Sequence, residues 1–167
     1  MRILITGAAG NLGSFLAREL LAGPHQLRLM IHHRELPFRI TGCPNVSICR
    51  ADPGKTETLV DACCDIECIV HFAGLLFAPR PEQFLPKTNP GYVQNLVAAA
   101  LLAHVDKFIL ISFPHVEGET FPGRPATNRL DGRPDSVHAR TRLAAERHLF
   151  DACENTNMVP VVPRAGA

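Results

Sequence analysis

The sequence has almost no net charge and no long apolar stretch. Its 17 lysines and arginines are balanced by 16 aspartates and glutamates, which leaves a formal net charge of +1. A nearly neutral chain has no general attraction for nucleic acid or for an anionic membrane surface, so we expect neither as a partner. No stretch approaches the ~20 apolar residues that cross a bilayer. The short apolar run after Arg2 is unlike the long one of a secretion signal. These absences predict a cytoplasmic location.

Cysteine spacing of the kind that marks a small secreted domain is also missing. The six cysteines show no such framework, so reduced thiols are expected. The grouping most similar to a metal site is Cys63, Cys64 and Cys68 with His71. Because Cys68 is expected to start a strand, these side chains would not converge as tetrahedral zinc ligands. We therefore expect no metal site.

The first thirteen residues carry the most informative pattern that is present. Residues 3–5 (ILI) are typical of a strand buried on both faces, and a helical pattern begins at Ser14. Between them lie Gly7, Gly10 and Gly13, which would respectively allow the turn, the approach of a pyrophosphate and close helix packing. The amides and dipole at the start of such a helix favour a bound phosphate. A strand–glycine turn–helix arrangement predicts dinucleotide binding. The expected contacts are Gly7, Ala9, Gly10, Asn11, Leu12 and Gly13.

The remainder of the chain alternates between strand and helix patterns. Further strands are expected at 26–31, 46–49, 68–72, 107–112 and 158–162, and helices at 14–23, 56–64, 89–104 and 136–154. This alternation predicts an α/β fold with a doubly wound parallel sheet in three αβα layers, the Rossmann fold, with strand order 3-2-1-4-5-6. Residues 1–167 would form a single domain. The proline-broken segment 75–87 is a candidate lid or substrate loop, and 113–135 is expected to be a long polar loop.

The end of the second expected strand indicates which dinucleotide is bound. An acid there would bind the ribose hydroxyl of NAD, whereas a nearby arginine accommodates the 2′-phosphate of NADP. This chain has His32, His33 and Arg34, and Glu35 comes only after the arginine. We therefore expect NADP in preference to NAD, with a solvated basic turn as the bland interpretation of the same residues.

The second half of the chain contains further charged candidates. His115 and Glu117 follow the fifth expected strand and could touch a substrate, although a solvated loop pair is the simpler interpretation. Several arginines could attract an anionic substrate such as a nucleotide sugar. The acids between them favour solvated surface instead. These arginines are Arg124, Arg129, Arg133, Arg140 and Arg142.

Residues 6–13 (TGAAGNLG) resemble the TGxxGxxG motif of the extended short-chain dehydrogenase/reductases, the NAD-dependent epimerase/dehydratase group. Asp52 stands where that family has an aspartate near the adenine, and residues 72–74 (FAG) are similar to its fourth-strand signature. Small residues at Ala73 and Gly74 would also let the nicotinamide side of a cofactor pass close to the backbone. Asn89 resembles the family's central-helix asparagine, and residues 164–166 (RAG) its Arg-Pro-Gly after the sixth strand.

The resemblance implies an NAD(P)-binding oxidoreductase that transfers hydride at a carbonyl or hydroxyl carbon of a small molecule. The family is usually about twice as long as this chain, so the C-terminal substrate lobe is expected to be absent or truncated. A homodimer is among the assemblies expected.

The catalytic positions depart from the family pattern. The family uses a serine or threonine after the fifth strand and a Tyr-x-x-x-Lys pair on the next helix. Here His138 and Arg142 stand at the tyrosine and lysine positions, and Ser112 is at or next to the hydroxyl position, which by count is Phe113. The only tyrosine, Tyr92, lies in a different helix.

Two hypotheses follow from this departure. His138 could be the acid/base, since imidazole titrates near neutral pH, with Arg142 assisting one helical turn away. Arginine cannot relay a proton as lysine can, however. Alternatively, the catalytic set is lost, and the module senses a nucleotide or binds a partner without chemistry.

Overall fold

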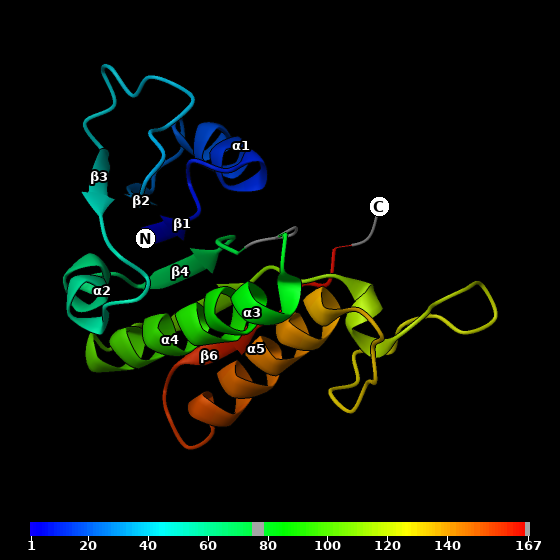
Figure 1. The fold of residues 1–167 in the computed structure, drawn as a ribbon. Coiled ribbons are helices and arrows are strands. Elements are labelled where there is room, and N and C mark those ends of the chain that lie inside the picture. The colour runs from blue at the N-terminus through cyan, green and yellow to red at the C-terminus, as the bar shows by residue number, and fades with distance from the viewer. Residues whose placement is uncertain (75–78, 166–167) are drawn as a thin grey trace.

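The computed structural model describes residues 1–74 and 79–165, and its centre is a single parallel sheet (Figure 1). Six strands lie in the order β3-β2-β1-β4-β5-β6, which confirms the predicted doubly wound topology. In this register Thr6 of β1 lies between Met30 of β2 and His71 of β4, so these strands end at the same edge. The strands are β1 (Arg2–Thr6), β2 (Gln26–Ile31), β3 (Val46–Arg50), β4 (Cys68–His71), β5 (Lys107–Leu110) and β6 (Val159–Val161).

Helices cover the two faces of the sheet and complete the expected three layers (Figure 1). α1 (Asn11–Leu20) packs on one face, where Ala17 and the strand residues Ile5 and Leu29 are all buried in one apolar cluster. α2 (Thr56–Cys63), α4 (Tyr92–Leu102) and α5 (Val137–Cys153) pack on the other face around Phe108, which is fully buried. Within the described ranges, no helix is long and apolar enough to cross a membrane.

The proline-rich segment after β4 differs from its prediction. Residues 75–78 of the expected loop lie outside the described residues, but Pro81–Pro86 form the short helix α3. Lys87–Gly91 then form a π-helical turn that continues directly into α4. The loop prediction is therefore wrong from residue 81 onward, and the helix predicted from residue 89 continues one that begins earlier. Pro86 and Pro90 each remove an amide donor and crowd the preceding turn, and the wider π turn accommodates them.

Candidate active site

The three motif glycines have different reasons to be glycine. Gly7 adopts a left-handed φ of +70°, and a Cβ placed on it would lie 2.8 Å from the backbone nitrogen of Ala73. A Cβ on Gly13 would lie 2.3 Å from the carbonyl oxygen of Gly7. The fold itself therefore requires these two glycines. Gly10 is extended (φ −90°, ψ 173°), and its Cβ would meet only that same oxygen, at 3.2 Å. Packing within the protein therefore gives a weaker reason for glycine at position 10 than at positions 7 and 13.

The amino end of α1 presents backbone donors without protein acceptors. The helix begins at Asn11, three residues earlier than predicted, and its first intrahelical bond runs from the amide of Ser14 to the carbonyl of Gly10. Within residues 1–74 and 79–165, the amides of Asn11, Leu12 and Gly13 have no hydrogen-bond acceptor. The first turn contains no acidic residue. Three free amides at the positive end of a helix dipole are suited to a phosphate.

A second group lies where β2 and β3 end. The rings of His32 and His33 have centroids 3.6 Å apart, and Nε2 of His32 is 3.7 Å from Oδ1 of Asp52. Burial, followed by the charge of His33, lowers the pKa of His32. The amide of Gly54 donates to Oδ1 of Asp52 at 2.9 Å and, with the charge of His32, holds the pKa of this carboxyl below its usual value. Asp52 is therefore ionised and oriented at neutral pH.

The cations beside this group differ in their partners. The guanidinium of Arg50 donates to the carboxylate of Glu35 and to the carbonyl of His32. Arg34 is exposed and has neither a hydrogen bond nor an ion pair in the part of the chain that is described. The acid nearest to Arg34 in sequence is thus already occupied, and the charge of Arg34 remains available.

The end of β4 contains a buried polar pair beneath two small residues. Nδ1 of His71 and Oγ1 of Thr6 are 2.7 Å apart, and both residues are buried. Burial, together with the charge of Arg142, lowers the pKa of His71 to about 3. The chain then passes through Ala73 and Gly74. A Cβ on Gly74 would lie 3.0 Å from Nη1 of Arg142, so a larger residue would displace the guanidinium.

Asn89 and the first turns of α5 complete this side of the site. Asn89 is fully buried in the π-helical turn, and its Nδ2 donates to Oγ1 of Thr141 at 3.1 Å. On α5, Nη2 of Arg142 donates to the carbonyl of Ile111 at 2.9 Å. Nε and Nη1 of Arg142 are buried and have no partner among the described atoms. Among the described residues, no carboxylate binds this guanidinium.

His138 lies one turn before Arg142, near the start of α5. The hydroxyl of Ser136 caps this helix by accepting from the amide of Ala139 at 3.1 Å, which fixes the first turn. The His138 imidazole is half-buried and stacks on the ring of Phe113, with centroids 4.9 Å apart and planes 22° apart. Burial and the charge of Arg142 lower the pKa of His138. His138 is therefore a neutral base at physiological pH.

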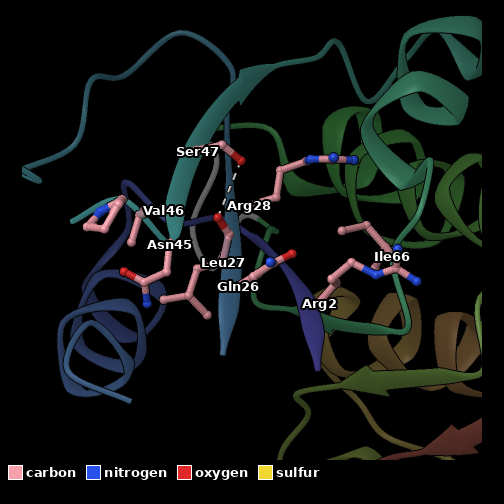
Figure 2. A pocket seen from close by; sticks show the side chains of 9 residues that line it. Arg2, Gln26, Leu27, Arg28, Asn45, Val46, Ser47 and Ile66 are labelled. Carbon is pink, nitrogen blue, oxygen red and sulfur yellow. Dashed lines mark hydrogen bonds between the residues drawn. The ribbon is translucent and has the colours of Figure 1, made fainter. Parts of the chain in front are cut away.

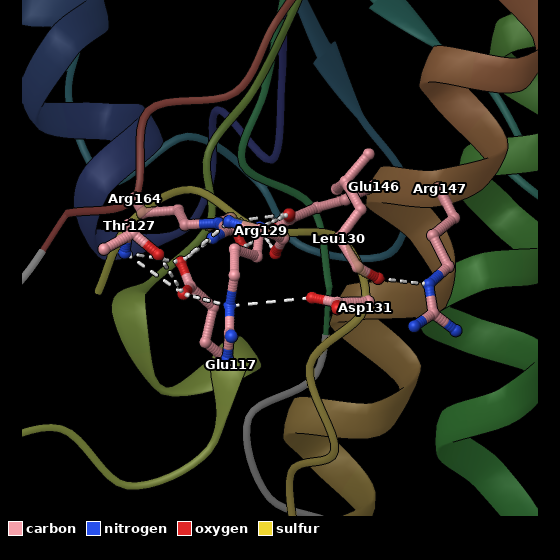
Figure 3. Close-up of polar contacts among 9 residues, drawn as sticks. Glu117, Thr127, Arg129, Leu130, Asp131, Glu146, Arg147 and Arg164 are labelled. Carbon is pink, nitrogen blue, oxygen red and sulfur yellow. Dashed lines mark hydrogen bonds and ion pairs between the residues drawn. The ribbon is translucent and has the colours of Figure 1, made fainter. Parts of the chain in front are cut away.

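Ser112 donates into a buried ionic network whose members Glu117, Glu146 and Arg164 are shown in Figure 3. Its hydroxyl, 5% exposed as a residue, donates to Oε1 of Glu146, which is fully buried. Arg164 donates to Oε2 of Glu146 at 2.6 Å and also to the carboxylate of Glu117. The side chains of Arg164 and Glu117 are only 6% and 5% exposed. The network ties the loop after β5, α5 and the segment after β6 into one unit.

The structure decides the prediction for His115 and Glu117. The solvated loop pair is wrong for Glu117, because this carboxylate is buried and accepts from the amides of Thr127 and Arg129. His115 is exposed as expected. Glu146 was missed because a single glutamate in an amphipathic helix carries no sequence signal. Arg164 was marked only as part of the family-like segment 164–166.

A cavity of about 290 Å³ lies at the opposite, amino-terminal edge of the sheet (Figure 2). Its cationic lining is already used by the protein. Nη1 of Arg28 donates to the carbonyls of Ala62 and Cys64 at the end of α2, and Arg2 pairs with Glu67. The predicted site residues all lie at the other edge, where ligands bind in open parallel α/β sheets.

Comparison with known proteins identifies the family of the chain. Residues 3–166 match the model of the NAD dependent epimerase/dehydratase family, and the chain belongs to this family. It is 30% identical over 146 residues to the uronate dehydrogenase of Pseudomonas syringae pv. tomato, covering 87% of this chain and 51% of the relative. It is 31% identical over 174 residues to the low-salt glycan biosynthesis protein Agl12 of Haloferax volcanii, covering 98% of this chain and 56% of the relative.

Solved structures show the same relation. MoeE5 in complex with UDP-glucose and NAD superimposes with a TM-score of 0.79 at 26% identity, over 98% of this chain and 54% of MoeE5. UDP-glucuronic acid 4-epimerase from Bacillus cereus in complex with NAD gives a TM-score of 0.78 at 26% identity, over 98% and 56% of the two chains. The chain thus spans about half the length of the relatives that it matches.

Proposed function

We propose that this protein binds a nicotinamide dinucleotide and transfers hydride at a carbonyl or hydroxyl carbon of a small-molecule substrate. The observation that carries the proposal is the start of α1, where Gly10 leaves room and three amides lack acceptors within the described residues. Membership of the epimerase/dehydratase family, and relatives described as complexes with NAD, support the same conclusion.

The residues present fit such a cofactor. The turn from Gly7 to Gly13, including Ala9, Asn11 and Leu12, would hold the diphosphate with backbone amides. Asp52 would face the adenine, and Ala73, Gly74 and Asn89 would line the nicotinamide side. When bound, the nicotinamide ring supplies the hydride acceptor or donor.

We further propose a preference for NADP over NAD. Arg34 is an exposed cation without a partner in the described chain, and Glu35 is paired with Arg50 instead of standing alone as a ribose acceptor. His32 and His33 add donors beside it. A 2′-phosphate would give Arg34 the partner that it lacks.

In the proposed chemistry His138 moves the proton and Arg142 assists. His138 is neutral at physiological pH because burial and the Arg142 charge lower its pKa, so it can accept a proton from a substrate hydroxyl. Arg142 remains a fixed charge beside it and orients neighbouring hydroxyl groups with its unpartnered Nε and Nη1. The hydroxyl of Ser112 donates a hydrogen bond to the carboxylate of Glu146, so it is not aimed at a substrate. Ser112 contributes instead by holding the loop after β5 in place.

The test is a titration with NADPH and NADH, followed by hydride-transfer assays on a panel of sugars, alcohols, aldehydes and ketones. His138→Gln should bind the cofactor normally and lose roughly 10²–10⁴-fold in turnover. His148→Gln, a half-buried histidine of the same helix, is the matched control and should retain turnover.

Each failure has a separate meaning. Absence of dinucleotide binding would refute the proposed function, and turnover that survives His138→Gln would refute the acid/base assignment. Binding without turnover of any substrate would favour the non-catalytic nucleotide-sensing module.

A further inference from the structure

Phe113 lies against the one imidazole that the proposed chemistry uses. Its ring is nearly parallel to that of His138, with centroids 4.9 Å and planes 22° apart. The exposed ring of His115 lies on Phe113 as well, with centroids 6.0 Å apart. By the sequence resemblance, Phe113 is counted at the hydroxyl position, with Ser112 next to it. A phenyl ring there cannot hydrogen-bond a substrate, so its contribution must come through what it contacts.

The backbone around Phe113 is well anchored. The amide of Ser112 donates to the carbonyl of Pro163 at 2.9 Å, and the carbonyl of Ser112 accepts from Ala165 at 3.0 Å. Pro114 follows Phe113 and opens a short 3-10 turn that runs to Glu117. The backbone of Phe113 is therefore held between the backbone pairing of Ser112 on one side and the turn that Pro114 opens on the other. Phe113 can thus act as a rigid support for the ring that stacks on it.

We propose that Phe113 is a positioning residue that holds the His138 imidazole in one plane and shields one of its faces from water. The inference rests on the proposed role of His138 as the acid/base. Aromatic pairs in this separation range favour a defined geometry, and Phe113 covers a face of the imidazole rather than the ring edge, where both nitrogens lie. Phe113 would thus supply orientation to His138 through its ring.

Arg142 is the charged group that acts on His138, one turn away on the same helix. Of the neighbouring histidines, His71 on β4 has its pKa lowered by burial and by the charge of Arg142, and His115 lies against Phe113. Burial is the largest cause of the lowered His138 pKa, followed by Arg142. Removing the phenyl cover would let water reach the imidazole and ease its protonation.

The experiment compares Phe113→Leu and Phe113→Tyr with Phe121→Leu as the matched control. Phe121 belongs to the same connection between β5 and α5, is 56% exposed, and has no ring contact with His138 in the described structure. The pKa of His138 is measured by NMR titration of the histidine ring resonances, assigned by their loss in His138→Gln. Turnover and cofactor affinity are measured across pH on the same proteins.

Phe113→Leu should raise the His138 pKa and shift the acid limb of the pH–rate profile to higher pH. It should also lower kcat by roughly ten- to a hundred-fold with unchanged dinucleotide affinity. Phe113→Tyr, which keeps the stacked ring, should retain the parent values of the His138 pKa and of kcat. Phe121→Leu should change neither the pKa nor kcat. A His138 pKa that is unchanged or lower in folded Phe113→Leu would overturn the inference. Because this titration needs no turnover, its result is separate from survival of activity in His138→Gln, which would overturn the acid/base assignment, and from absence of dinucleotide binding, which would overturn the proposed function.

Discussion

Replacing Arg164 with methionine tests whether the buried ionic network stabilises the fold at the edge of the site. Methionine keeps most of the side-chain volume but leaves the carboxylates of Glu117 and Glu146, 5% and 0% exposed, without their shared cation. Breaking a buried pair from one side costs about 3–5 kcal/mol. For a chain of this size that corresponds to a fall in Tm of roughly 6–20 °C, at about 2–4 °C per kcal/mol.

The matched control is Arg50→Met. Arg50 pairs with Glu35, but the two side chains are 54% and 74% exposed, and such a surface pair contributes about 0–1 kcal/mol. Both variants are unfolded in urea and by heat at neutral pH, with circular dichroism as the signal. Adding Glu117→Gln to Arg164→Met should recover part of the loss, because it removes one uncompensated charge. Equal urea midpoints for Arg164→Met and Arg50→Met would refute the reasoning.

The same network gives acid sensitivity with a defined sign. Burial would raise the pKa of Glu117, but the amides of Thr127, Asn128 and Arg129 and the charge of Arg164 outweigh it and lower this pKa. The contribution of Glu117 to the free energy of unfolding is therefore fully present above the ordinary glutamate pKa of about 4.3, and it is lost as the pH falls below that value. The penalty of Arg164→Met should accordingly shrink as the solution is acidified.

Three further outcomes are expected. Because the pKa of His71 is lowered to about 3 in the folded chain, the unfolded chain binds a proton at this histidine at higher pH than the folded chain does. The free energy of unfolding should therefore fall by about 2 kcal/mol between about pH 6.5 and pH 5. In urea titrations, the free energy of unfolding of His71→Gln should depend less on pH over this range. Gly13→Ala should lose about 1–3 kcal/mol in the same assay, because its Cβ would lie 2.3 Å from a backbone oxygen; an unchanged midpoint would contradict the tight helix–turn contact. Arg34→Ser should weaken NADPH binding by roughly ten-fold and NADH binding little, as measured by fluorescence titration, and equal losses would contradict a phosphate contact.

The sheet and the glycine turn could be predicted because local pattern and topology coincide there. An apolar triple before the glycine series, followed by helical spacing from Ser14, admits few alternatives, and the doubly wound topology that this motif indicates has the strand order 3-2-1-4-5-6. His138 and Arg142 were marked instead by the family resemblance, and the structure places the guanidinium of Arg142 beside Gly74. The predictions of the sheet and the turn depended on periodicity over many residues, which single substitutions do not obscure.

Features that depend on one or two residues could not be predicted. Pro86 and Pro90 indicated a broken loop, but a π-helical turn let the chain stay helical across them. Glu117 and Glu146 are polar residues in polar surroundings of the sequence, and only the folded chain places Arg164 between them. The stacking of Phe113 on His138 joins residues on different elements and likewise has no local signature.

The most direct test of dinucleotide binding at the head of α1 is a calorimetric titration of Gly10→Val with NADPH and NADH. The control is Gly123→Val, where a Cβ meets only the ring of Phe121 at an ordinary 3.8 Å. Gly10→Val should keep its fold by circular dichroism, since its backbone is extended, and should lose at least roughly ten-fold in affinity, which is about 1.4 kcal/mol. Affinity for the dinucleotide equal to that of Gly123→Val and the parent protein would contradict the account.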